Sequence, residues 1–187
     1  MAETDEEIIS RVLSGNRDDF ALLVDRYKDK VFAMVIGIIK NRELAKEVAQ
    51  DVFVKTYVSL KKFRKESTFS TWIYRISYNT AISETRKASY KNVLLDENYI
   101  VDTFENSAEE NEKKEESHEQ LSKAISLLKT DEKFILKLYY FEEKAISDIS
   151  RITGLGQSNV KIKLHRLRNK LRKLIVDNNE KELLLNG

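Results

Sequence analysis

The sequence of 187 residues contains no cysteine, no proline and only five glycines. Without cysteine the chain can form neither a disulfide nor a thiolate metal site, which fits a reducing compartment. The scarcity of proline and glycine disfavours many-stranded sandwiches and favours long helices. The longest apolar stretch, from Val31 to Ile39, is far shorter than the roughly 20 residues that cross a bilayer. The acidic start has no signal-peptide pattern, so we expect a soluble cytoplasmic protein.

The residues that usually carry catalysis are also scarce. The only two histidines are His118, in an acidic segment, and His165, in a basic one. The sequence has no phosphate-binding glycine loop, no nucleophile elbow and no two-histidine metal spacing. We therefore expect no catalytic residues, no metal and no cofactor.

The net charge of +2 conceals an uneven distribution. Residues 1–91 are net basic, residues 92–119 are strongly acidic, and residues 120–187 are net basic again. This order suggests two modules joined by an acidic connector, with both modules able to approach a polyanion.

The connector differs in kind from its neighbours. From Asn106 to Glu119 it has no large apolar residue, so it cannot bury enough surface to offset the entropy lost on ordering. We predict a flexible linker over residues 92–118. The alternative is a solvated helix that continues into Leu121.

Apolar periodicity predicts four helices in the first module. The first follows Thr4 and stops at Gly15. The second runs from about Arg17 to Lys40, the third from there to about Lys62 with Tyr57 facing inward, and the fourth begins near Ser70. On the fourth helix two sets of side chains separate: Trp72, Ile73, Ile76 and Thr80 share one face, whereas Tyr74, Arg75, Tyr78, Asn79 and Arg86 lie largely elsewhere.

Four further helical patterns follow the connector. They cover residues 119–129, with Leu121 facing inward, a segment that begins after Thr130, Ala145 to Thr153, and Gln157 to about Val176. The third ends at Gly154. The last carries apolar residues at steps of four and three, which form one inward stripe: Val160, Leu164, Leu167, Leu171 and Leu174. No strand pattern of useful length is present.

A short helix, a glycine turn and a basic amphipathic helix form a helix-turn-helix arrangement, which lays its second helix into the major groove of DNA. No acidic residue lies between Asp148 and Asp177. The first turns carry side chains of the kind that read base edges: Gln157, Ser158, Asn159 and Lys161. Lys163, Arg166 and Arg168 are better placed for phosphates. The alternative is a solvated Lys- and Arg-rich helix that binds nothing.

The stretch from Leu127 to Leu171 resembles the C-terminal domain, sigma domain 4, of the bacterial sigma-70 family, in particular its extracytoplasmic-function (ECF) group. The residues that carry the resemblance are Gly-Leu-Gly-Gln-Ser-Asn-Val-Lys-Ile-Lys-Leu-His-Arg-Leu-Arg, from Gly154 to Arg168. The first module is similar to sigma domain 2 in two runs. These are Ala-Lys-Glu-Val-Ala-Gln-Asp-Val-Phe, from Ala45 to Phe53, and Phe-Ser-Thr-Trp-Ile-Tyr-Arg-Ile-Ser-Tyr-Asn, from Phe69 to Asn79, followed by Arg86 and Lys87.

The resemblance implies an all-α protein of two small helical domains joined by a flexible acidic linker. Residues 1–91 would form sigma domain 2, which binds core RNA polymerase and the −10 element. Residues 92–118 would be the linker, which threads the polymerase channels. Residues 119–187 would form sigma domain 4, whose helix-turn-helix binds the −35 element.

The resemblance also implies roles for individual residues. Glu47, Gln50, Asp51 and Phe53 match the surface that docks on the clamp helices of the polymerase β′ subunit; the alternative is a solvated acidic face with Phe53 in the core. Ser67, Thr68, Ser70 and Thr71 match the loop that captures a flipped base of the −10 element. Arg75, Asn79, Arg86 and Lys87 match the helix that meets −10 DNA. Trp72 could be a stacking platform, but its spacing with Ile73 and Ile76 favours the core.

The expected partners are core RNA polymerase (β′ clamp helices and β flap), promoter DNA and an anti-sigma factor. The chain departs from the family pattern at Gly156, where a helix-capping Ser or Thr is usual, at Asn159 and Ile162, and at residues 83–85. These departures leave the preferred −35 and −10 sequences open. Two other functions also remain open: a helix-turn-helix regulator that acts without polymerase, and a helical adaptor that binds acidic proteins.

Overall fold

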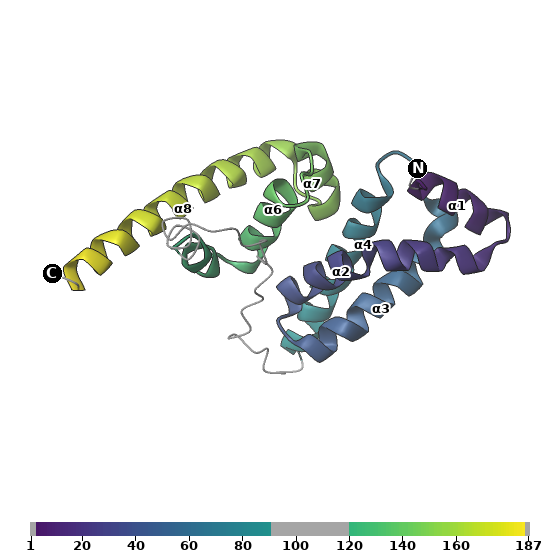
Figure 1. Cartoon of the computed structure of the whole chain (residues 1–187), viewed down its shortest axis with the longest axis horizontal. Helices are drawn as coiled ribbons and strands as arrows, with labels where there is room; N and C mark the ends of the chain where they lie inside the picture. The colour runs from purple at the N-terminus through teal and green to yellow at the C-terminus, as the bar shows by residue number, and fades with distance from the viewer. Residues whose placement is uncertain (1–2, 91–119, 186–187) are drawn as a thin grey trace.

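A computed structural model of the protein describes residues 3–90 and 120–185, and every regular element in these ranges is a helix (Figure 1). The predicted all-α fold class is therefore confirmed, and so is its arrangement as two groups of helices. The predicted linker lies outside the described residues. None of the described helices is both long and apolar enough to span a membrane.

The first module consists of four α-helices and two short 3₁₀ turns. Its elements are α1 (Asp5–Ser14), η1 (Arg17–Asp19), α2 (Phe20–Ile39), α3 (Arg42–Ser59), η2 (Leu60–Lys62) and α4 (Phe69–Tyr90). Local side chains fix where helices begin: Thr4 and Glu7 form a capping box, and the Asn41 side chain accepts a hydrogen bond from the Leu44 N–H at 2.9 Å.

Helices α2, α3 and α4 pack on one another around a core of aliphatic side chains. Val31, Val35, Ile39, Val52 and Ile73 are all 0% exposed. Burial of each such side chain contributes roughly 1.5–3 kcal/mol, so this cluster holds the three helices in register.

The second module begins with helical residues 120–126, followed by α6 (Thr130–Tyr140), α7 (Ile146–Thr153) and α8 (Gln157–Leu185). Gly154 ends α7 in a left-handed conformation with φ of 74°, which a side chain would strain. The predicted inward stripe is confirmed at its first three positions, because Val160, Leu164 and Leu167 are buried, whereas Leu171 and Leu174 are only partly buried. Helix α8 extends nine residues beyond the predicted end at Val176.

Three side chains lie differently from the sequence-based expectation. Tyr57 and Leu121, predicted to face inward, are 38% and 40% exposed. Tyr57 packs edge-on against Phe20 at the rim of the core, with ring centroids 5.0 Å apart. Tyr74, predicted to lie off the packed face of α4, is 1% exposed. Its burial has a tertiary cause, because α7 packs against α4 and α6 packs against α2, so the second module covers part of the first.

We expect Leu164→Ala to destabilise the second module by about 2–5 kcal/mol, because it deletes buried methyl groups and leaves a cavity. Denaturant unfolding followed with amide hydrogen exchange in α6–α8 measures the loss. The control is Ile162→Ala on the same helix, where the side chain is 47% exposed and a change within about 0.5 kcal/mol is expected. Equal losses in both variants would contradict the assignment of the inward stripe.

Candidate nucleic-acid interface

The start of α8 presents polar side chains to solvent on a rigid support. Gln157, Ser158, Asn159 and Lys161 are all exposed, whereas Val160 between them is buried. The preceding turn is fixed by the Ser150 hydroxyl, which donates to the Leu155 carbonyl at 2.6 Å. The structure thus brings together the four side chains that were predicted to read bases, at a helix N-terminus whose dipole favours an anion.

The three cations predicted to contact phosphates are not equivalent. Arg166 and Arg168 are exposed, but Lys163 forms an ion pair with Asp131 at 2.9 Å. About two turns further along α8, Lys170 pairs with Glu132 at 2.7 Å. Both acids lie in the first turn of α6, so an acid-free stretch of sequence has acidic neighbours in space.

These ion pairs shift the carboxyl groups of α6. Burial raises the pKa of Asp131, but the hydrogen bond and positive charge of Lys163 outweigh it, so the pKa lies below its ordinary value of 3.8. Burial also raises the pKa of Glu132, but the hydrogen bond and positive charge of Lys170 help to outweigh it, so this pKa too lies below its ordinary value. Lys163 is therefore held toward α6 in the free protein.

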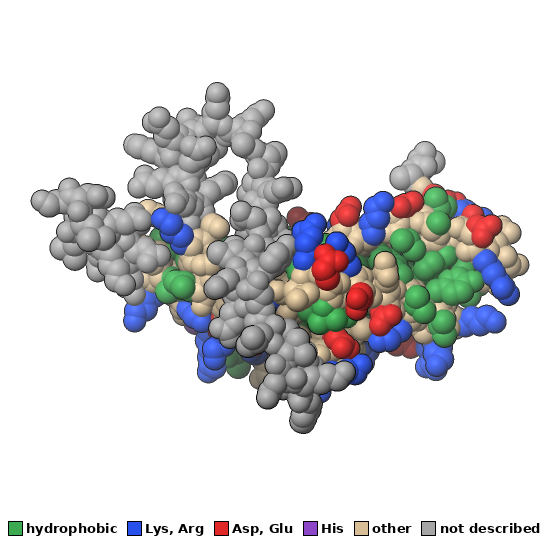
Figure 2. All heavy atoms as spheres, turned by 90° about the horizontal axis from the view of Figure 1, so that it is seen from below, with side chains coloured by type: hydrophobic (Ala, Val, Ile, Leu, Met, Phe, Trp, Pro, Cys, Tyr) green, Lys and Arg blue, Asp and Glu red, His purple; other side chains and the backbone are tan. Residues whose placement is uncertain are grey.

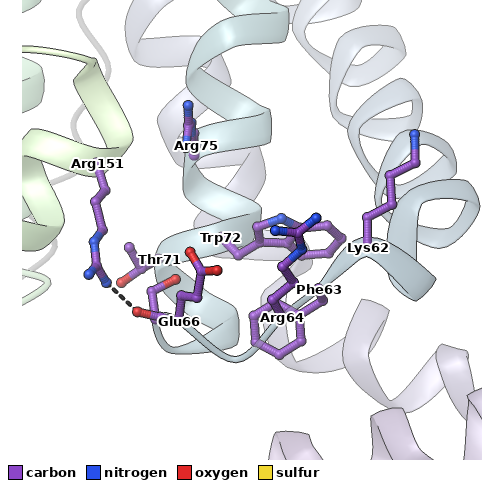
Figure 3. A pocket seen from close by; sticks show the side chains of 9 residues that line it. Lys62, Phe63, Arg64, Glu66, Thr71, Trp72, Arg75 and Arg151 are labelled. Atoms are coloured by element: carbon purple, nitrogen blue, oxygen red, sulfur yellow. Dashed lines mark hydrogen bonds between the residues drawn. The ribbon is translucent and has the colours of Figure 1, made fainter.

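A cavity of about 220 Å³ opens beside the start of α4 (Figure 3). It is lined by Lys62, Phe63, Arg64, Glu66, Ser67, Thr71, Trp72, Arg75 and Arg151. Its volume is below the roughly 300–1,000 Å³ of pockets for drug-sized ligands, so it suits a smaller group. Its lining combines aromatic rings, hydroxyls and cations, which is the chemistry that holds a nucleobase and its phosphate.

The four hydroxyl residues predicted to capture a base divide into two kinds. Ser67 and Thr71 line the cavity. Thr68 and Ser70 instead stabilise the start of α4: the Thr68 hydroxyl lies 2.9 Å from the hydroxyls of both Ser70 and Thr71, and it accepts the Thr71 N–H at 3.3 Å. Sequence spacing gave no means of separating a capping hydroxyl from a lining one.

Trp72 combines the two roles that the sequence left open. It is partly buried against the core, with its ring 5.2 Å from the Phe63 ring and 5.8 Å from the Phe69 ring. It also forms part of the cavity lining beside Phe63 (Figure 3). The indole is therefore a rigid wall of the cavity, held in place by packing on its other side.

A polar stripe continues from the cavity along α4. Arg75, Asn79 and Arg86 follow one another at steps of four and seven, so they share one helix face, and all three are exposed. Lys87 is exposed beside them and pairs with Glu84 at 3.1 Å. Since Arg75 also lines the cavity, the cavity and the stripe form one continuous surface.

A different surface occupies the outer face of α3. Glu47, Gln50 and Asp51 are exposed there, while Phe53 is partly buried against the core. The same face continues through two apolar residues that the sequence reading missed, Val54 (61% exposed) and Val58 (75% exposed). They could have been found in the sequence, because they fall out of register with the inward stripe of Ala45, Val48 and Val52.

Exposed apolar side chains on α3 belong to a wider feature of the first module. Seen from below, the side on which α3 lies, hydrophobic side chains gather on the right-hand part of the molecule (Figure 2). Exposed apolar patches rimmed by charged residues mark protein-binding surfaces. The α3 face is thus suited to a protein partner, in contrast to the cationic surfaces of α4 and α8.

Two family models match the chain: Sigma-70 region 2 over residues 23–90, and Sigma-70, region 4 over residues 118–171. The ECF RNA polymerase sigma factor SigW of Bacillus subtilis is 30% identical over 178 residues, which cover 90% of this chain and 95% of the relative. The ECF RNA polymerase sigma-E factor of Haemophilus influenzae is 32% identical over 179 residues, which cover 90% and 94%.

Solved structures share the fold. The sigma factor RpoE of Bartonella quintana, solved with the anti-sigma factor NepR, aligns with a TM-score of 0.66 at 20% identity, covering 84% of this chain and 96% of that one. CnrH, solved with the cytosolic domain of CnrY, aligns with a TM-score of 0.64 at 18% identity, covering 94% and 99%.

Replacing Lys163 by Gln should raise the pKa of the Asp131 carboxyl, because the ion pair that lowers it is lost. NMR titration of the carboxyl carbons measures the change. Since the folded pKa of Asp131 is lowered, the pair stabilises the fold above pH 3.8 and loses this effect as the pH falls through the folded pKa. The control Lys161→Gln removes the same charge from an exposed position on α8, and an equal shift there would argue against the pairing.

Proposed function

This chain belongs to the ECF group of the sigma-70 family of RNA polymerase sigma factors, and from that premise we propose how its surfaces direct core RNA polymerase to promoters. The observation that carries the proposal is that two separate cationic surfaces, at α4 and at α8, lie on the modules that match region 2 and region 4. Sigma factors are not enzymes, and we assign no catalytic residue. The protein acts in the cytoplasm, where polymerase and promoter DNA are found.

The start of α8 reads the −35 element. Gln157, Ser158, Asn159 and Lys161 contact base edges in the major groove, supported by their exposure in the first turns of the helix. Arg166 and Arg168 contact phosphates, and Lys163 joins them by exchanging Asp131 for a phosphate. Asn159 replaces the usual Thr of the family, so the preferred −35 sequence differs from the common one at the base it meets.

The cavity beside α4 receives a flipped base of the −10 element. Extracting a base from the stack costs a few kcal/mol, which a rigid aromatic wall and nearby hydroxyls offset. Trp72 and Phe63 supply the wall, and Ser67 and Thr71 supply the hydroxyls. Thr68 and Ser70 act indirectly, because they fix the start of α4. The stripe of Arg75, Asn79, Arg86 and Lys87 then follows the DNA strand away from the cavity.

The outer face of α3 binds the clamp helices of the β′ subunit. Glu47, Gln50 and Asp51 supply polar contacts, and the exposed Val54 and Val58 supply apolar area. Phe53 supports this face from below, since it is partly buried. The second module contacts the β flap.

We assign residues 1–91 to sigma domain 2, residues 92–118 to an acidic flexible linker, and residues 119–187 to sigma domain 4; the matches to region 2 over residues 23–90 and to region 4 over residues 118–171 support this division. An anti-sigma factor completes the set of partners. Two structural neighbours of this chain were solved with a bound protein, CnrH with the cytosolic domain of CnrY and RpoE with the anti-sigma factor NepR, and this chain has the same fold.

Reversing the charge of Asp51 tests the polymerase surface. We expect Asp51→Arg to weaken binding to core polymerase at least tenfold, about 1.4 kcal/mol, because an attractive contact becomes repulsive. Co-purification and run-off transcription measure the effect. The control Glu6→Arg makes the same charge change at an exposed position of α1. If Asp51→Arg binds polymerase as the unmodified protein does, β′ docks elsewhere. If the unmodified protein binds no polymerase, the function is that of a helix-turn-helix regulator.

Two variants of α8 separate base contacts from phosphate contacts. Gln157→Ala should alter the preferred −35 sequence. If the Gln157 contact is bidentate, the variant loses about 1–3 kcal/mol of discrimination between bases at one position. Arg168→Ala should weaken binding to all sequences alike and reduce the dependence on salt. Selection from a promoter library with polymerase holoenzyme measures both. Identical behaviour of the two variants would show that the division between base and phosphate contacts is wrong.

A further inference from the structure

Ile162 is an exposed apolar side chain in the part of α8 that is proposed to read the −35 element. It is 47% exposed, although it lies between Val160 and Leu164, which are 0% and 2% exposed. At 3.6 residues per turn, a side chain two positions from a buried one points about 160° away from it. Ile162 therefore points almost directly outward from the core of the second module.

The surroundings of Ile162 on the helix are polar. Within residues 157–168 it is the one apolar side chain that is exposed. The side chains three and four positions away, which share its face, are all exposed and polar: Ser158, Asn159, His165 and Arg166. A single exposed apolar residue is ordinary on a protein surface, so the place of Ile162 on the helix must decide whether it has a function.

The position of Ile162 along α8 places it among the side chains that are proposed to read bases. It lies five residues after Gln157, about 7.5 Å along the helix axis, which is within the roughly 12 Å width of the major groove. Arg166 lies about 13.5 Å from Gln157 by the same measure, at the distance of the phosphates. A helix that enters the groove with Gln157 to Lys161 therefore carries Ile162 in with them.

Two neighbouring cations of α8 are held to one side of the outward face. Lys163 pairs with Asp131 at 2.9 Å, and Lys170 pairs with Glu132 at 2.7 Å. Both acids belong to α6, so these pairs draw the two ammonium groups toward the flank of α8 that packs on α6. The centre of the outward face is thus an apolar side chain between polar ones.

An isoleucine has one partner in the major groove. Its side chain has no hydrogen-bond donor or acceptor, so it can bind neither a phosphate nor a polar base edge. The apolar group that base pairs display in this groove is the C5-methyl group of thymine. A branched side chain on a helix keeps one strongly preferred χ1 rotamer, so little conformational freedom is lost on contact. Removing one methyl group from water contributes about 0.8 kcal/mol, a factor of about four in affinity.

We infer that Ile162 is a specificity-determining residue, which selects thymine at one position of the −35 element through apolar contact with the thymine methyl group. The inference rests on the proposed function of α8. Side chains three residues apart on a helix lie about 5–6 Å from each other, and base pairs stack about 3.4 Å apart. The selected thymine therefore lies within about two base pairs of the base that Asn159 meets.

Deoxyuridine tests the contact, because it lacks only the methyl group of thymine and keeps its base pairing. The −35 element that the unmodified holoenzyme selects is rebuilt with deoxyuridine at each thymine in turn, on both strands, and holoenzyme binding is measured. We expect one position at which deoxyuridine weakens binding about four-fold. Ile162→Ser should abolish the response at that position, whereas Ile162→Val, which keeps a branched apolar side chain, should retain part of it.

Val176→Ser is the matched control, because Val176 is 49% exposed on the same helix and lies about 21 Å beyond Ile162, outside the groove. This variant should respond to deoxyuridine as the unmodified chain does. The inference is overturned if no deoxyuridine weakens binding of the unmodified chain, if Ile162→Ser keeps the full response, or if Val176→Ser also loses it. These outcomes leave the −35 function of α8 intact. If the unmodified holoenzyme selects no −35 sequence, that function fails and the inference fails with it, so the two failures are distinguishable.

Discussion

Val160, Leu164 and Leu167 of α8 are buried in the same core as Ile149 and Ile152 of α7, and the other surfaces of the second module depend on this packing. An α-helix that buries one apolar stripe must present its remaining positions to solvent. The stripe therefore orients Gln157 to Lys161 outward, and the left-handed Gly154 sets the angle at which α8 leaves α7. The position of the proposed recognition surface follows from the core beneath it.

Helix α4 packs against two partners, the other helices of the first module and helix α7 of the second. Ile73 and Ser77 are buried within the first module, whereas Tyr74 is covered by the second module through Glu142 and Lys144. The face that carries Arg75, Asn79 and Arg86 stays exposed to solvent. The proposed −10 surface combines this face with the cavity, and the contact of Arg151 with the Glu66 carbonyl links the cavity to the second module.

Much of the fold could be predicted from the sequence, because its signals are local. Helix periods, the Thr4 capping box and the Gly154 stop depend on neighbours within a few residues, and the structure confirms them. The family also follows from local runs, Ala45 to Phe53 and Gly154 to Arg168. The outward faces of α3 and α8 were predicted for the same reason, since a helix that is buried on one side determines its other side.

Contacts between distant segments could not be predicted in this way. Asp131 and Lys163 are 32 residues apart, and Tyr74 and Glu142 are 68 apart, so no period links them. The sequence by itself determined the helices, the two modules, the family and the chemistry of each exposed face. Only the tertiary structure decided that Lys163 is paired, that Thr68 caps α4 while Thr71 lines the cavity, and that Tyr74 is buried. The physical reason is that burial and pairing depend on which surfaces meet in space, and periodicity describes one helix at a time.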